Sequence, residues 1–62
     1  METSQERIRP LVLVVDDEMV VRILVREALE QSGHEVCEAE NGAQALERFI
    51  EHRPDIVLMD IM

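Results

Sequence analysis

Aromatic residues are almost absent from this sequence: Phe49 is its only aromatic side chain, and it has no tryptophan or tyrosine. Proteins that bind single-stranded nucleic acid stack the bases on aromatic rings, and this chain offers no such platform. Basic residues are also scarce, since 6 lysine and arginine residues stand against 14 acidic ones, for a net charge of −8. A phosphate backbone would repel that charge. We therefore expect no direct binding of nucleic acid, and a cation or a basic protein surface as the favoured partner.

Cysteine is nearly absent too, because Cys37 is the only one and no intrachain disulfide can form. The first ten residues, METSQERIRP, mix charges of both signs and lack the apolar segment of a signal peptide. No apolar run approaches the roughly 20 residues that a membrane helix needs. A lone thiol without a secretory signal is typical of a reducing compartment. We expect a cytoplasmic protein without a membrane span, and a disordered lead-in over residues 1–10.

Zinc binding has little support in the sequence. The residues that could hold zinc through nitrogen or sulfur are His34, Cys37 and His52, and their spacing matches no zinc-binding pattern. We expect His34 in a turn, Cys37 half-buried in a strand and His52 at a helix end.

The first regular segment is LVLVV, residues 11–15, an apolar run of the kind found in strands buried on both faces of a parallel sheet. From residue 18 to residue 32 the apolar period becomes helical, and Gly33 follows where a helix favours a residue with positive φ. The pairs Glu18–Arg22 and Arg26–Glu30 have the i,i+4 spacing of helix ion pairs. The predicted buried stripe of this helix is Val21, Leu24, Val25, Ala28 and Leu29.

The second half of the sequence repeats this alternation. Residues 35–39 predict a short mixed strand, and Asn41-Gly42 predicts a turn or helix cap. A second helix is expected over about residues 43–52, closed by Pro54, and residues 55–60 predict a third, apolar strand. The predicted buried stripe of the second helix is Ala45, Leu46, Phe49 and Ile50.

The order β-α-β-α-β with short connections predicts an α/β fold with a parallel sheet. Right-handed crossovers then favour a doubly wound sheet with strand order 2-1-3, in which the first and third strands are neighbours. Ligands of such sheets bind beyond the carboxyl ends of the strands, where the strand order reverses.

Carboxylates stand at that edge of the predicted sheet. Asp16 and Asp17 end the first strand, and Asp60 ends the third. Like charges this close repel each other unless a cation lies between them, and oxygen ligands favour Mg²⁺ or Mn²⁺ over Zn²⁺. An aspartate at such a site can also act as a nucleophile toward a phosphoryl group. The sequence therefore predicts a metal-assisted phosphoryl site.

A simpler interpretation assigns the acidic run to helix capping, since acidic residues are favoured at a helix N-terminus. Asp17 alone would fit that role, and Glu18 is expected to cap the first helix. Asp16 and Asp60 fit it poorly, because each ends an apolar strand.

The segments VLVVDDE, AENGAQAL and PDIVLMDIM together resemble the receiver domain of two-component response regulators, over residues 11–62. The resemblance implies a flavodoxin-like fold and a signalling module rather than an enzyme. It implies that Asp60 accepts a phosphoryl group from a phosphohistidine of a sensor histidine kinase or phosphotransfer protein. It also implies that Asp17 binds Mg²⁺ directly, Asp16 largely through water, and Met62 through its backbone carbonyl.

Receiver domains are about twice as long as this chain, within the usual range for single domains. The resemblance therefore implies an N-terminal half, with the last two β-α units missing. The Thr or Ser and the Lys that those units carry in the family are not in the sequence, and we expect their absence to impair phosphorylation of the chain. The third strand would then be an apolar edge, and edges of this kind pair with other chains. We expect a homo-oligomer formed through that edge.

Two other functions compete with the phosphoacceptor. The chain could be only a self-assembling structural or interaction module, and protection by a metal ion would distinguish the two. A metal-dependent phosphohydrolase also uses an aspartate at a strand end, but it requires a second aspartate where this chain has Met62.

Overall fold

The fold is built around a buried central strand. The computed structural model describes residues 8–59. Five elements follow one another along the chain: β1 (Leu11–Val15), α1 (Met19–Gln31), β2 (Glu35–Ala39), α2 (Gly42–His52) and β3 (Ile56–Met59). All five residues of β1 are buried, as expected of an apolar run in the middle of a parallel sheet.

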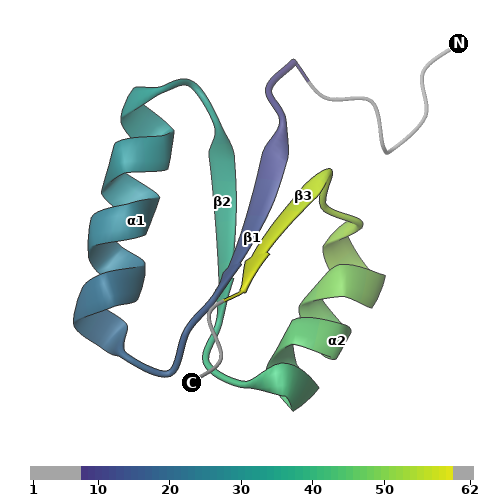
Figure 1. Cartoon of the computed structure of the whole chain (residues 1–62). Coiled ribbons are helices and arrows are strands. Elements are labelled where there is room, and N and C mark those ends of the chain that lie inside the picture. The colour runs from purple at the N-terminus through teal and green to yellow at the C-terminus, as the bar shows by residue number, and fades with distance from the viewer. Residues whose placement is uncertain (1–7, 60–62) are drawn as a thin grey trace, which may run out of the picture.

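The sheet has the predicted topology. β1 pairs in parallel with β2 on one side and with β3 on the other, so the strand order is β2-β1-β3 (Figure 1). Asp55 fixes one end of the β1–β3 pair, because its Oδ2 accepts a hydrogen bond from the Leu11 N–H at 2.8 Å and its own N–H donates to the Leu11 carbonyl at 2.9 Å. The prediction of a doubly wound α/β fold, a truncated flavodoxin-like sheet, is confirmed.

The two helices flank the sheet, one on each face, and both pack on β1 and β2 (Figure 1). Alternate residues of a strand point to opposite faces, so β1 supplies both layers. On the α2 face the core consists of Leu13, Val15, Ala39 and Ala45, with half-buried Cys37 packed against them, as expected for that cysteine.

Helix α1 ends as the sequence predicts. Gly33 has φ of +89°, in the left-handed region that favours glycine. The Gly33 N–H donates to the Glu30 carbonyl and the His34 N–H donates to the Leu29 carbonyl. These carbonyls of the last turn of α1 therefore have hydrogen-bond donors. His34 was expected in this turn, but it lies directly after it, before β2 begins. The Arg26–Glu30 ion pair forms at 3.0 Å.

The predicted stripe of α1 was too wide. Val21, Val25 and Leu29 are half-buried, whereas Leu24 and Ala28 are exposed. The three half-buried residues are spaced by four and form a single ridge along the helix. A helix that rests on only two strands buries one ridge, so the neighbouring positions remain outside the contact.

Helix α2 begins at Gly42, one residue before the predicted start, and Asn41 is its N-cap. The Asn41 side chain accepts a hydrogen bond from the Gln44 N–H at 2.9 Å, which confirms the predicted cap. The helix ends at His52, as predicted, and Arg53 takes a left-handed conformation with φ of 49° before Pro54.

The predicted buried stripe of α2 was wrong at three of its four positions. Ala45 is buried, but Leu46, Phe49 and Ile50 are 62%, 49% and 63% exposed. The four residues of β3 are exposed as well. The cause is common to both elements: β3 is an edge strand of the described sheet, and within residues 8–59 no element lies beyond it to cover this side of α2.

Within residues 8–59, neither helix has the length and apolar character that crossing a membrane requires. The predicted lead-in falls mostly on residues 1–7, which lie outside the described residues.

Candidate functional site at the carboxyl end of the sheet

Asp16 is the first residue after β1, and the fold holds it by its backbone and its side chain. It is only 8% exposed. Its N–H donates to the Ala39 carbonyl of β2 at 3.1 Å. Its Oδ1 accepts a hydrogen bond from the Glu18 N–H at 2.9 Å. The Asp16 carboxylate is therefore fixed between the end of the sheet and the start of α1.

This hydrogen bond corrects the expectation about capping. Glu18 is the N-cap residue by position, but its side chain makes no capping hydrogen bond. Asp16 accepts from an N–H at the helix start instead, as aspartates do when they bond the backbone two residues ahead. Asp17 is exposed and free of this role, which leaves its carboxylate available for a ligand.

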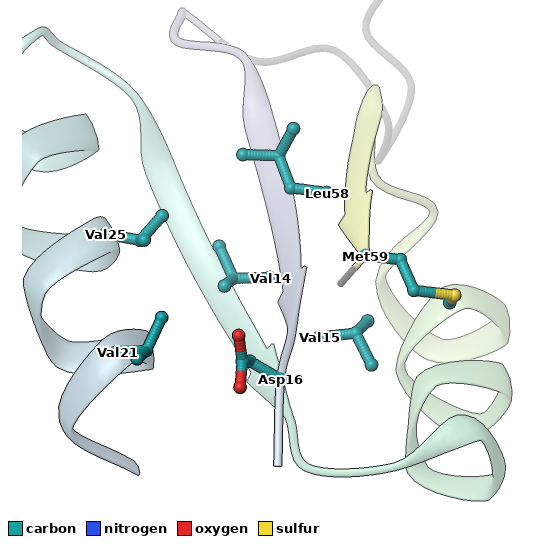
Figure 2. A pocket seen from close by; sticks show the side chains of 7 residues that line it. All are labelled: Val14, Val15, Asp16, Val21, Val25, Leu58 and Met59. Atoms are coloured by element: carbon teal, nitrogen blue, oxygen red, sulfur yellow. The ribbon is translucent and has the colours of Figure 1, made fainter. Parts of the chain in front are cut away.

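A small hollow of about 230 Å³ adjoins this strand end (Figure 2). Asp16 lies on the same side of the sheet as Val14 and faces Val21 of α1, whereas Val15 and Met59 point to the opposite side (Figure 2). Among residues 8–59, Asp16 is the only polar residue that lines the hollow, and the other described lining residues are apolar.

The end of β3 lies beside the end of β1. Val15 pairs with Met59, the last residue of β3. Asp16 follows Val15 in the sequence and Asp60 follows Met59. Asp60 and Met62, both predicted to be site residues, lie outside the described residues. Of the four predicted site residues, the structure describes Asp16 and Asp17, and places them together at the end of β1.

An ion-pair network adjoins Asp16 on the α1 face. Arg22 Nε bonds Glu38 Oε1 at 3.0 Å, and Arg26 Nη1 bonds Glu38 Oε2 at 2.6 Å. Arg22 Nη1 also donates to the backbone carbonyl of Asp16 at 2.8 Å. The hydrogen bond from Arg26, together with the one from Arg22, holds the pKa of Glu38 below its ordinary value, although partial burial opposes this shift. The pKa of Arg26 is raised by its hydrogen bonds to Glu30 and Glu38.

The i,i+4 spacing predicts a pair between Glu18 and Arg22 but does not predict this network. The Arg22 side chain instead turns inward, to the Glu38 carboxylate and the Asp16 carbonyl. A signal was present: Glu38 pairs with Val14 and therefore shares the face that α1 covers. A carboxylate on a covered face requires a cation, and Arg22 and Arg26 stand one turn apart on that helix.

The donor set suits a hard divalent cation. Asp16 and Asp17 supply carboxylate oxygens, the ligands that Mg²⁺ and Mn²⁺ favour. Within residues 8–59 there is no cluster of three histidine, cysteine or acidic side chains that could hold a metal ion. The predicted site draws its further ligands from Asp60 and Met62, beyond that range.

Comparison with known proteins agrees with this geometry. Residues 12–62 match the family model described as the response regulator receiver domain. The chain is 51% identical over 51 residues to the chemotaxis protein CheY of Bacillus subtilis, covering 81% of this chain and 42% of that protein. It is 42% identical over 50 residues to sporulation initiation phosphotransferase F of the same organism, covering 81% of this chain and 40% of the relative.

A third relative is the polar-differentiation response regulator DivK of Brucella anthropi, which is 44% identical over 50 residues, covering 81% of this chain and 41% of DivK. The chain thus spans about two fifths of the length of these relatives. The matched region contains both helices, β2, β3 and all of β1 except Leu11, together with the two aspartates that follow β1. With its β2-β1-β3 parallel sheet and its acidic strand end, the chain belongs to the response regulator receiver domain family.

Proposed function

We propose that this chain is the phosphoacceptor segment of a two-component response regulator and that Asp60 is the acceptor. The observation that carries the proposal is the pairing of Val15 with Met59, because the next residues along the two strands are Asp16 and Asp60. The chain acts in this proposal as a signalling module and not as an enzyme with turnover. Its location is the cytoplasm, consistent with its lone thiol.

The proposed metal site uses four residues. Asp17 is the direct ligand, Asp16 acts largely through water, and Asp60 and the Met62 carbonyl complete the set. The exposed Asp17 and the fixed Asp16 support this division of roles. When bound, Mg²⁺ or Mn²⁺ neutralises charge on the transferring phosphoryl oxygens.

The proposed reaction is a phosphoryl transfer from a phosphohistidine. A carboxylate oxygen of Asp60 attacks phosphorus, the P–N bond of the donor breaks, and its electron pair stays on the imidazole nitrogen. The products are an acyl phosphate on Asp60 and a histidine that takes a proton from solvent. The donor is a sensor histidine kinase or a phosphotransfer protein, in line with the names of the regulator and phosphotransferase relatives.

The test is to locate the phosphoryl group chemically. The chain is incubated with Mg²⁺ and phosphoramidate, a small donor with a P–N bond, then reduced with borohydride and mapped by peptide mass spectrometry. Reduction of an acyl phosphate converts an aspartate to homoserine, and the expected site is position 60. Asp17→Asn is the matched control and should lower the yield. Homoserine at another position, or an equal yield without Mg²⁺, would contradict the proposal.

A second proposal concerns assembly: the 62-residue chain associates with itself through β3. The two edges of the described sheet differ, because β2 carries Glu35 and Glu38 whereas β3, Ile56–Met59, carries no charge. Charged residues discourage pairing at an edge strand, and an uncharged apolar edge favours it. The exposed side of α2 adds apolar surface next to that edge.

Sedimentation velocity tests the assembly. The wild-type chain should sediment as an oligomer, and Val57→Lys on β3 should shift it to the monomer. Ala43→Lys adds the same charge at an exposed position of α2 and should leave the oligomer intact. A folded wild-type monomer would refute this proposal. Oligomers without any metal-dependent phosphorylation would favour a purely structural role.

A further inference from the structure

Arg22 and Arg26 share one partner but differ in a second. Each donates to a different oxygen of Glu38, Arg22 at 3.0 Å and Arg26 at 2.6 Å. Only Arg22 reaches the functional strand end, where its Nη1 donates to the Asp16 carbonyl at 2.8 Å. Arg26 instead bonds Glu30 on its own helix. The two arginines are thus a natural pair for separating a role in stability from a role at the site.

The bond from Arg22 acts on one particular peptide group. The carbonyl of Asp16 and the N–H of Asp17 belong to the same peptide, which is planar. Fixing the oxygen therefore fixes the plane from which the Asp17 backbone continues. The Asp16 N–H is held on the other side by the Ala39 carbonyl. Both backbone polar groups of Asp16, its N–H and its carbonyl, are therefore held by hydrogen bonds, and the exposed Asp17 follows directly in the chain.

The anchor is rigid because Arg22 is itself held. Its side chain is only 12% exposed, and that of Glu38 is 22% exposed. A guanidinium that uses separate nitrogens for a carboxylate and a carbonyl has little rotational freedom left. Hydrogen bonds to a charged donor are also stronger than neutral ones. Glu38 on β2 thus orients Arg22, and Arg22 orients the peptide that leads to Asp17.

We propose that Arg22 is a positioning residue, which sets the direction of the Asp17 carboxylate in the metal site. The inference rests on the proposed function, because it assigns Asp17 as the direct ligand. Arg22 touches neither the metal nor the phosphoryl group in this scheme. It acts through the Asp16–Asp17 peptide, and residues of this supporting kind commonly alter metal affinity about 10- to 100-fold when they are replaced.

The experiment compares three variants of the full chain: Arg22→Met, Arg22→Lys and the control Arg26→Met. Two readouts are used, the Asp17 amide signal in a ¹⁵N correlation spectrum without metal, and the Mn²⁺ dissociation constant measured by electron paramagnetic resonance. Circular dichroism verifies that each variant is folded. Arg22→Lys keeps the charge but lacks the planar guanidinium that donates to two acceptors at once, so it remains informative if Arg22→Met does not fold.

Both Arg22 variants should shift or broaden the Asp17 amide signal and weaken Mn²⁺ binding about 10-fold or more. Arg26→Met should leave the Asp17 amide in place and change the Mn²⁺ affinity less than about 2-fold. An unchanged Asp17 amide in both Arg22 variants, or equal effects of Arg22→Met and Arg26→Met, would overturn the inference. Absence of Mn²⁺ binding by the wild-type chain would overturn the proposed metal site instead, and the amide signal would still decide whether Arg22 orients the peptide.

Discussion

Val15 and Met59 are direct partners in the parallel register of β1 and β3. These two apolar residues end strands that are 44 residues apart in the sequence, and each is followed by an aspartate. The register of β1 and β3 is also fixed at the opposite end of the two strands. There Asp55 forms hydrogen bonds with Leu11 through both its side chain and its backbone. The relationship between Val15 and Met59 therefore links the fold to the proposed chemistry.

Asp17→Asn should weaken Mn²⁺ binding strongly with little effect on folding. Asp17 is exposed, and exposed substitutions usually change stability by less than about 0.5 kcal/mol. Glu18→Gln is the matched control, because it removes a neighbouring negative charge whose side chain makes no capping bond. Metal titration of the three proteins checks this, and equal weakening by both variants would show that general charge, not ligation, attracts the cation.

Asp16→Ala should destabilise the fold by about 1–2 kcal/mol. It removes a buried carboxylate that accepts the Glu18 N–H at the start of α1, and capping bonds of this kind contribute about that much. Urea unfolding measures the change, with Asp17→Ala as the control that should stay within about 0.5 kcal/mol. Similar losses in both variants would mean that the Asp16 hydrogen bond does not stabilise the helix start.

The Glu38 network predicts a pH dependence of stability. The pKa of Glu38 is lower in the folded chain than its ordinary value, chiefly because of the hydrogen bond from Arg26. A depressed carboxyl pKa stabilises the fold above the unfolded-state pKa, and that stabilisation is lost as the pH falls through the folded-state pKa. The stability difference between the wild type and Glu38→Gln should therefore be largest near neutral pH and shrink in acid. Urea unfolding over a pH series measures it, and a difference independent of pH would contradict the assignment.

The two glycines should respond to alanine in opposite directions. Gly33 has φ of +89°, and although space is open around it, a side chain there is strained. Gly33→Ala should cost about 1 kcal/mol. Gly42 begins α2 and a Cβ would meet nothing within 4 Å, so Gly42→Ala should stabilise by about 0.5–1 kcal/mol. Thermal unfolding of both variants measures this, and stabilisation by Gly33→Ala would be inconsistent with the left-handed helix end.

Much of the fold could be predicted because local patterns and the sheet agree. The apolar run at residues 11–15, the glycine at position 33 and the cap at Asn41 each correspond to a feature of the structure. The exposed residues Leu46 and Phe49 could not be predicted, because periodicity identifies the face of a helix that can be buried but not whether a neighbouring element covers it. Their exposure depends on what lies beside β3.

The site divides in the same way. The pair Asp16 and Asp17 was visible as charge after a buried strand. Their separate roles were not, because the choice between capping a helix and facing a ligand depends on the turn geometry that Asp16 and Glu18 adopt. The i,i+4 spacing alone assigns Arg22 to a surface pair with Glu18. Its partner in the structure is Glu38, on the face of β2 that α1 covers.

The most direct test of the central claim is the intact mass of the chain after incubation with acetyl phosphate and Mg²⁺, beside an Asp60→Asn variant. We expect the gain of one phosphoryl group on the wild type, in at least a fraction of the molecules, and no gain on the variant. No gain on a wild-type sample shown by circular dichroism to be folded, or an equal gain on both proteins, would contradict it.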